Sequence, residues 1–396
     1  MPRNRRTERG DTAGIRTKRM GGQDMRIALL SAASSIHTAR WVSALAARGH
    51  AVALFSMERH SAPAGSISPD VPVYYLRGGY LRATCALKKG LAAFAPQVLN
   101  VHYATGYGTL ARRSGFAPVL LSVWGSDVYD FPRKSPFHRQ IVVRNLRAAT
   151  AVASTSERMA MRVEELCPQT RPPFITPFGV DTGVFSPADP PRVRDGRLTI
   201  GIVKALETKY GVDVLLRAFA CVLPQLSDLD VRLEIYGGGS RRQALEQLAV
   251  CLGVEKRTRF FGAVPHEQVP EVLRRMDIFC APSVSDSESF GVSAVEALAC
   301  GVPVVASAVD GFKEVLRDGE TGFLVPPFNA QAMAGRLVRL ARDADLRRRM
   351  GAAGRADVQE RFEWQTCVTR MEQALVSTIR LRAGGETNEA KRGAAG

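Results

Sequence analysis

Two glutamates, Glu288 and Glu296, belong to a segment whose residue types suit the binding of a phosphorylated ligand. Glu288 stands in a polar loop, and Glu296 lies in a helix predicted from Phe290 to Cys300, among small or apolar neighbours. Burying an unpaired carboxylate there costs roughly several kcal/mol, so we expect it to have a partner. Solvated or salt-bridged side chains explain most isolated pairs of glutamates, so the residues around them carry the interpretation.

The start of this helix predicts an anion site. The first backbone N–H groups of a helix have no intrahelical acceptor, and the helix dipole favours negative charge there. These amides belong to Phe290, Gly291 and Val292, and Gly291 has no side chain to obstruct a phosphate or a sugar. We interpret the segment as a nucleotide-sugar site. The amides take the diphosphate, Glu296 takes the ribose diol, and Glu288 lies near the reacting sugar.

A resemblance to a known family becomes specific here. The string from Glu288 to Glu296 (ESFGVSAVE), with ACGVPVVA soon after it, resembles the signature of family 4 of the retaining GT-B glycosyltransferases. The string from Asp310 to Val325 (DGFKEVLRDGETGFLV) resembles a second family segment, with Asp310 in place of its first glycine. The likeness covers roughly residues 25–375.

The resemblance implies an α/β protein with the GT-B fold, in which two Rossmann-like domains with parallel sheets face each other across a cleft. It also implies sugar transfer with retention of anomeric configuration, no metal, and no cofactor beyond a nucleotide-diphosphate sugar as co-substrate. The acceptor is expected on the first domain, as a glycan or lipid-linked precursor, and the donor mainly on the second.

The composition is that of a soluble two-domain protein: 396 residues, 45% hydrophobic and 23% charged. No apolar run approaches the ~20 residues that a membrane helix needs. Seven scattered cysteines, an odd number without a Cys-x-x-Cys pair, indicate reduced thiols in a cytoplasm rather than a disulfide framework or a structural zinc.

The formal charge of +16 favours an anionic partner, whether nucleic acid, membrane or substrate. Residues 1–24 are basic and poor in apolar side chains, which predicts a disordered tail. This tail is either a functional arm or the result of a misassigned start site. A nucleic-acid-binding protein is the rival interpretation from another class, but no zinc finger or ribonucleoprotein signature is present, so we expect no nucleic-acid partner.

The first domain begins with a strand–helix–strand unit typical of a doubly wound parallel sheet. The apolar strands run from Met25 to Ser31 and from Ala51 to Ser56. Between them Ser34, Ser35 and His37 fall at the carboxyl edge of the sheet, where such sheets bind ligands. His37 contacts donor or acceptor, or is simply a residue of the first helical turn.

A later predicted strand, Val119 to Val123, leads into Trp124 and Asp127. Many family members have a histidine that touches the donor sugar at the place of Trp124. We expect Trp124 to stack on a sugar face instead. Asp127 either orients a substrate hydroxyl as part of the catalytic apparatus or caps the following turn.

The second domain begins with the predicted strand Leu198 to Val203, followed by Lys204 and Lys209, which we expect to converge on one diphosphate. The family has arginine in the place of Lys204, and Tyr210 is an insertion before Gly211. Lysine keeps the charge but lacks the bidentate fork of arginine. Gly237 opens a glycine loop after the next strand, which we expect to contact the donor.

Two basic stretches without acids favour a peripheral contact with an anionic membrane. One spans Arg133 to Arg147 and the other holds Arg77, Arg82, Lys88 and Lys89. Solvated helix faces are the alternative explanation.

Two further rivals remain: a GT-B epimerase or hydrolase that acts on the donor alone, and a silent scaffold, which the presence of both glutamates and both lysines disfavours. The expected organisation is a basic tail (1–24), an acceptor domain (25–185), a linker (186–197), a nucleotide-sugar domain (198–362), a crossover helix (363–382) and a disordered tail (383–396).

Overall fold

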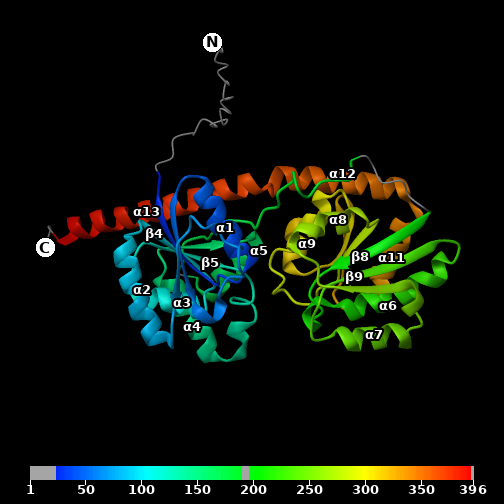
Figure 1. The fold of residues 1–396 in the computed structure, drawn as a ribbon, viewed down its shortest axis with the longest axis horizontal. Coiled ribbons are helices and arrows are strands. Elements are labelled where there is room, and N and C mark those ends of the chain that lie inside the picture. Colours follow the sequence, from blue (N-terminus) through cyan, green and yellow to red (C-terminus); the bar gives the residue numbers. More distant parts are fainter. Residues whose placement is uncertain (1–23, 169, 190–195, 394–396) are drawn as a thin grey trace, which may run out of the picture.

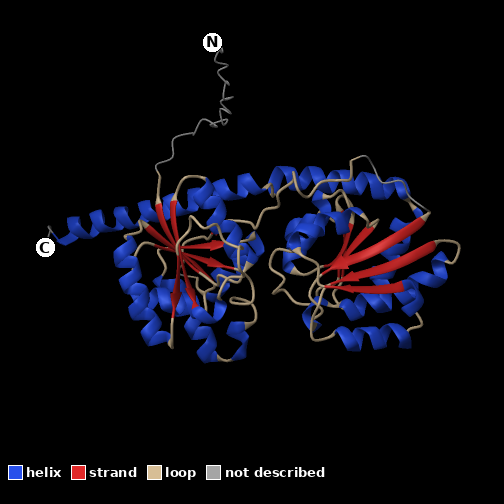
Figure 2. Cartoon of the chain, in the orientation of Figure 1, coloured by secondary structure: helices blue, strands red, loops and turns tan. Residues whose placement is uncertain are grey.

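The computed structural model describes residues 24–168, 170–189 and 196–393. Apart from Asp24, the predicted basic tail lies outside the described residues, as do residues 190–195 of the predicted linker. The chain forms two α/β domains side by side, each with a parallel sheet between layers of helices (Figure 1, Figure 2). The predicted fold class is confirmed.

The first domain has a seven-stranded sheet in the order β3-β2-β1-β4-β5-β6-β7. Its central strands are buried along almost their whole length, as expected of a parallel sheet covered on both faces. The strands are β1 (Arg26–Leu30), β2 (Ala51–Met57), β3 (Val73–Leu76), β4 (Val98–His102), β5 (Val119–Val123), β6 (Ala151–Ser154) and β7 (Phe174–Ile175). The helices are α1 (Ile36–Ala47), α2 (Tyr80–Phe94), α3 (Gly106–Ser114), α4 (Pro136–Ala148) and α5 (Glu157–Leu166).

The second domain has a six-stranded parallel sheet in the order β10-β9-β8-β11-β12-β13. The strands are β8 (Arg197–Val203), β9 (Asp230–Tyr236), β10 (Thr258–Gly262), β11 (Ile278–Ala281), β12 (Val304–Ser307) and β13 (Gly322–Val325). The helices are α6 (Val212–Val222), α7 (Arg242–Cys251), α8 (Val269–Arg274), α9 (Val292–Ala299), α10 (Asp310–Val315), α11 (Ala330–Arg342) and α12 (Ala344–Arg361). Short 3₁₀ turns are η1 (Glu58–His60), η2 (Phe131–Lys134), η3 (Thr208–Tyr210), η4 (Leu223–Leu226), η5 (Glu255–Arg257) and η6 (His266–Gln268).

The last helix, α13 (Trp364–Gly393), returns from the second domain to the first (Figure 1). Trp364 packs on Trp41 of α1 with ring centroids 4.9 Å apart, and Glu372 pairs with Arg48 at 2.9 Å and with His50 at 2.8 Å. The helix has its described end at Gly393, beyond the predicted end of the crossover helix at Arg382. A glycine pair lowers helix propensity by about 1 kcal/mol per residue but does not by itself end a helix.

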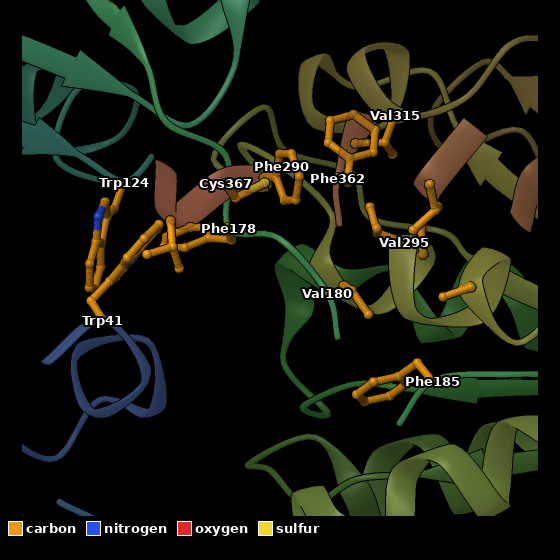
Figure 3. Close-up of a cluster of buried hydrophobic side chains, with 14 of the residues drawn as sticks. Trp41, Trp124, Phe178, Val180, Phe185, Phe290, Val295, Val315, Phe362 and Cys367 are labelled. Carbon is orange, nitrogen blue, oxygen red and sulfur yellow. The ribbon is translucent and has the colours of Figure 1, made fainter. Parts of the chain in front are cut away.

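A buried hydrophobic cluster joins the two domains behind the cleft (Figure 3). Trp124 and Phe178 of the first domain meet Phe290 and Phe362, with the Phe178 and Phe290 rings 6.1 Å apart and those of Phe290 and Phe362 5.2 Å apart. The loops that bear the candidate site are therefore anchored to one shared core.

The region between residues 57 and 97 offered few sequence signals, yet it contains β3 and α2. Within the described residues, no helix has the length and apolar character needed to cross a bilayer. Asp228 and Asp230 form an Asp-x-Asp pair, with Asp228 in the turn before β9 and Asp230 as the first residue of that strand. Both bond to arginines, Asp228 to Arg342 at 2.8 Å and Asp230 to Arg232 at 2.8 Å.

Candidate active site

The candidate site lies where the carboxyl ends of the two sheets meet. In each sheet the strand order reverses direction beside the first strand of the domain, between β1 and β4 and between β8 and β11. Open α/β sheets bind ligands at such points, because the flanking loops diverge there and leave a crevice. The loops after β1, β4 and β5 face those after β8, β9 and β11.

Lys204 and Glu288 form the central ion pair of the second domain. Lys204 Nζ lies 2.6 Å from Glu288 Oε2, and their side chains are 19% and 10% exposed. Ser283 Oγ donates a second hydrogen bond to the same carboxylate oxygen at 3.2 Å. Burial by itself lowers the pKa of Lys204, but the Glu288 carboxylate outweighs it, so the pKa lies above its ordinary value. The lysine therefore keeps its charge, and each side chain is a hydrogen-bonding partner of the other.

Tyr210, the inserted residue, lies between the two predicted phosphate lysines. Its ring centroid is 4.6 Å from Lys204 Nζ and 5.0 Å from Lys209 Nζ. A ring face attracts ammonium groups by about 0.5–1 kcal/mol where they are exposed, as Lys209 is. Both ammonium groups thus contact the same ring, and their predicted convergence on one diphosphate stays a prediction.

Gly237 allows the Lys204 loop to approach the end of β9. Its φ is +147°, and a Cβ there would lie 1.8 Å from the Lys204 carbonyl oxygen. A side chain at this position would push the loop away from the sheet. Gly237 thus acts by positioning Lys204, and its predicted contact with the donor stays a prediction.

Glu296 has a partner, as the sequence requires. The residue is 5% exposed, and its Oε1 lies 2.9 Å from His266 Nε2 at the start of η6. His266 is the more exposed side chain, at 39%. A ribose diol that reaches this carboxylate must share it with the imidazole or displace it.

The amino end of α9 begins at Val292, after Gly291 with φ +76°. No side chain caps it, so its first amides have no competing side-chain acceptor. The Phe290 side chain is a core residue, 1% exposed, and the adjoining loop is covered by α10, where Gly311 N donates to Glu288 O at 3.0 Å. Among the three predicted amides, those of Gly291 and Val292 lie closest to the start of the helix.

The first domain contributes an aromatic wall, which we define as His37, His102, Tyr103, Trp124 and Phe178. Trp124 is at its centre, with ring centroids 5.9 Å from His37, 4.3 Å from His102, 5.4 Å from Tyr103 and 5.2 Å from Phe178. Trp124 is 9% exposed, so most of its ring is covered by these neighbours. Sugar stacking on Trp124 stays a prediction, limited to the part of the ring left uncovered.

His37 stacks on Phe178 at 4.2 Å and faces the second domain. Burial, followed by the charges of Arg40, His266 and Lys204, lowers its pKa to about 3. The imidazole is therefore neutral at physiological pH, and Lys204 is close enough to influence it across the cleft.

His102 is fully buried beneath Trp124, and burial lowers its pKa to about 3. Its Nε2 lies 2.9 Å from Asn100 Oδ1, which can only accept, so Nε2 carries the proton. Its Nδ1 then accepts from Ser31 Oγ at 2.9 Å. Protonation would break this arrangement, so the wall is held in an uncharged state.

Asp127 holds the loop that carries Trp124. One carboxylate oxygen accepts from the backbone N–H groups of Trp124 (3.1 Å) and Gly125 (2.9 Å), and the other from that of Ala104 (2.8 Å). Asp127 is 1% exposed. This geometry matches the capping alternative of the sequence analysis, in which Asp127 positions the loop, and its catalytic alternative stays a prediction.

Ser34 and Ser35 lie at the rim of a cavity of about 630 Å³ that also includes His266. Ser34 N donates to His60 O at 3.0 Å, and Ser35 begins α1 without a side-chain cap bond. Neither Lys204 nor Glu288 lines this cavity, and the predicted substrate contacts of the two serines stay predictions.

Hydrogen bonds close the two domains on each other next to Glu288. Ser289 Oγ donates to the Trp124 carbonyl at 2.6 Å, and Ser156 Oγ donates to the Ser289 carbonyl at 3.0 Å. Tyr129 OH donates to Asp310 Oδ2 at 3.0 Å. Asp310, which replaces a family glycine, thus makes a contact between the domains that glycine could not make.

Four residues of this site escaped the sequence analysis as functional candidates: His102, Tyr103, Tyr210 and Ser289. β4 ends at His102 and Tyr103 follows it, just as Trp124 follows β5. The rule that ligands bind at the carboxyl ends of parallel strands, which led to Trp124, therefore applies equally to these two residues. In the part of the chain that the structure describes, no three His, Cys, Asp or Glu side chains gather as around a metal ion. Metal independence stays a prediction.

Two family models match most of the chain: "Glycosyl transferase 4-like" over residues 26–156 and "Glycosyl transferases group 1" over residues 188–357. A phosphatidyl-myo-inositol mannosyltransferase of Mycobacterium leprae is 38% identical over 178 residues, which are 45% of this chain and 46% of that protein. The alignment therefore spans about half the length of this relative.

A longer alignment links the chain to the GDP-mannose-dependent alpha-(1-6)-phosphatidylinositol monomannoside mannosyltransferase of Mycolicibacterium smegmatis. They are 30% identical over 282 residues, 68% of this chain and 72% of the relative. Among solved structures, sucrose-phosphate synthase from Thermosynechococcus elongatus superposes with a TM-score of 0.77 at 22% identity, covering 88% of this chain and 97% of the other. That likeness concerns the fold alone.

Proposed function

The chain belongs to the glycosyl transferases group 1 family, and from this premise we propose that it moves a sugar from a nucleotide-diphosphate sugar to a hydroxyl group of a lipid-linked or polysaccharide precursor. The observation that carries the proposal is the Lys204–Glu288 pair at 2.6 Å, beside Lys209 and the amino end of α9. Two cations and free helix amides suit a diphosphate, and a carboxylate beside them suits the sugar attached to it.

In the proposed reaction the anomeric carbon loses its bond to the diphosphate oxygen and gains one to the acceptor oxygen. The acceptor proton passes to the leaving diphosphate. Lys204, Lys209 and the α9 amides stabilise the negative charge on that diphosphate, a contribution that is often the largest in catalysis. Glu288 stabilises the positive charge that develops on the sugar. We propose retention of configuration and no requirement for a metal, as the likeness to family 4 implies.

Both named relatives act on phosphatidylinositol derivatives, which supports a lipid-linked acceptor and a cytoplasmic enzyme in peripheral contact with a membrane. The helices α2 and α4 carry most cations of the two predicted basic stretches on the first domain, while Arg77 precedes α2 and Arg133 lies in η2 before α4. All of these cations are exposed. Each cation near an anionic lipid surface contributes about 1 kcal/mol to binding.

A thermal-shift screen with UDP, GDP and ADP tests the donor assignment. A nucleotide at about 100 times its Kd adds roughly 2.7 kcal/mol to the free energy of unfolding. Product analysis with the matching nucleotide sugar, with and without acceptor, then separates transfer from the epimerase or hydrolase alternative. Absence of stabilisation by every nucleoside diphosphate would contradict the proposal.

Vesicle binding tests the membrane contact. We expect binding to anionic vesicles that weakens with salt and with the double change Arg139→Glu and Arg144→Glu on α4. The matched control is Arg217→Glu on α6, an exposed arginine of the other domain. Equal binding of the wild type to neutral and anionic vesicles would contradict an electrostatic contact.

A further inference from the structure

A cavity of about 530 Å³ lies inside the first domain, between the end of β2 and the helices α2, α3 and α4. Most of its surface is apolar, formed by three tyrosines and by further aliphatic and aromatic side chains. They include Tyr80, Tyr103, Tyr107, Leu110, Phe131 and Ile141. Its size is in the range that encloses most of a small ligand.

The tyrosine wall of the cavity is held in place by satisfied hydrogen bonds. Tyr107 OH lies 2.7 Å from His60 Nδ1 and accepts from Met57 N at 3.2 Å. Burial and the neighbouring Arg59 lower the pKa of His60, which favours a neutral ring whose Nδ1 accepts a hydrogen bond from the Tyr107 hydroxyl. The wall is thus built before any ligand arrives, which reduces the cost of ordering on binding.

Two arginines without acidic partners line the same cavity. Arg59 and Arg113 are exposed, and within the described residues neither forms an ion pair. Nearby Glu58 pairs instead with Arg77 at 2.9 Å. An unpaired arginine offers planar donors that fit phosphate oxygens. The cavity therefore combines an apolar interior with an anion-binding rim.

Tyr103 connects this cavity to the cleft. It lines the cavity, and its ring centroid lies 5.4 Å from Trp124 in the aromatic wall. It also has φ +72°, a left-handed conformation that costs a residue other than glycine of order 1 kcal/mol. Such strain is retained where the surroundings fix it, often at a functional site.

Apolar surface continues outside the cavity. Leu81, next to Tyr80 on α2, is 69% exposed, and Phe137 on α4 is 70% exposed. Phe137 contacts His138, which packs against Phe131 of the cavity wall with ring centroids 4.8 Å apart. A hydrocarbon chain longer than the cavity would meet these side chains.

We propose that this cavity binds the acceptor, and that the acceptor is an amphiphilic phosphate. Its hydrocarbon lies against the tyrosine and aliphatic walls, its phosphate lies between Arg59 and Arg113, and its reacting hydroxyl lies at the Tyr103 end, toward the cleft. That the bound ligand is the acceptor rests on the proposed function, but its binding to the cavity can be measured without any donor. A free glycan would leave the apolar walls unused.

Calorimetric titration of the full chain with decyl phosphate, below its micellar concentration, tests the proposal. We expect decyl phosphate to bind at least tenfold more tightly than inorganic phosphate or the neutral decyl maltoside. Arg113→Ala removes a cation, and Leu110→Trp fills the cavity. Each change should weaken the binding of decyl phosphate tenfold or more. Arg217→Ala is the charge-matched control on the second domain and should bind as the wild type does.

Nucleoside diphosphate binding by thermal shift shows whether each variant is folded. If Leu110→Trp fails this check, the surface double variant Arg59→Ala with Arg113→Ala replaces it. Decyl maltoside binding as tightly as decyl phosphate, or decyl phosphate binding unchanged in the folded variants, would overturn the proposal and leave the donor assignment standing. Failure of every nucleotide to bind would contradict the proposed function instead.

Discussion

The two walls of the cleft differ in the charge of their side chains. On the second domain, both glutamates are ionic or polar partners of a nitrogen: Glu288 lies 2.6 Å from Lys204 Nζ, and Glu296 lies 2.9 Å from His266 Nε2. On the first domain, the aromatic wall is uncharged, and the pKa values of both its histidines, His37 and His102, are lowered to about 3.

This difference indicates a division of labour. Paired charges at a strand end can exchange partners when an anionic ligand arrives, at little cost in desolvation. A neutral wall opposite them adds no cation to compete with the lysines. It also lowers the local dielectric, which strengthens every charge interaction in the closed cleft. The second domain is thus suited to diphosphate chemistry, and the first to exclude water and position the other substrate.

The largest expected effect concerns the charge of Glu288. Glu288→Gln keeps the shape but removes the negative charge, so we expect kcat to fall about a hundredfold, or roughly 2.7 kcal/mol, with KM little changed. Steady-state kinetics with the identified donor measures it. The control is Glu271→Gln, an exposed glutamate of α8. If kcat of Glu288→Gln stays within about threefold of the wild-type value, the catalytic role is wrong and Glu288 only positions the loop before α9.

The next test asks whether the aromatic wall must stay neutral. His102 has a pKa of about 3 in the folded protein against an ordinary value of 6.5, so the unfolded chain binds more protons as pH falls. Its contribution to stability is present above pH 6.5 and is lost as pH falls from there toward 3. Between pH 7.5 and pH 5 this loss is about 2 kcal/mol.

His102→Gln should remove that part of the pH dependence, because glutamine does not titrate. Urea unfolding at the two pH values measures the difference. His138→Gln, a partly exposed histidine of α4, serves as the control and should keep the wild-type slope. If His102→Gln loses as much stability on acidification as the wild type, the wall is not held neutral at this position.

A smaller effect distinguishes the two lysines. We expect Lys204→Ala and Lys209→Ala each to weaken donor binding or turnover by about tenfold or more, that is about 1.4 kcal/mol. Lys204→Ala should also lower the melting temperature, since it leaves the largely buried Glu288 without its cation, whereas Lys209 is exposed. Lys256→Ala, at the far end of the second sheet, is the control. Wild-type kinetics in both variants would remove the lysines from the site.

The smallest effect is expected at Glu296. Its carboxylate binds the ribose similarly before and during reaction, so Glu296→Gln should raise KM about fivefold and change kcat less. The comparison with Glu288→Gln in the same assay is the measurement. A kcat loss at Glu296 as large as that at Glu288 would show that the two carboxylates are not divided between binding and chemistry.

The sequence by itself determined the fold class, the positions of most strands along the chain and the loop that carries Glu288. These follow from local signals, such as apolar runs bounded by glycine and the family strings, and β5 was predicted with its observed bounds, Val119–Val123. β3 and α2 were missed because their residues show neither a clear alternation nor a strong capping signal.

Only the tertiary structure decided which side chains meet. Lys204 reaches Glu288 because β8 lies next to β11 in the sheet, and this strand order is not written in any local pattern. In the same way, packing placed Asp127 in a buried loop and Trp124 at the centre of the aromatic wall. It also brought Tyr80 of α2, Tyr103 after β4 and Tyr107 of α3 together in the lining of one cavity. Sequence periodicity fixes which face of an element is buried, but the neighbours on that face depend on packing across the whole chain.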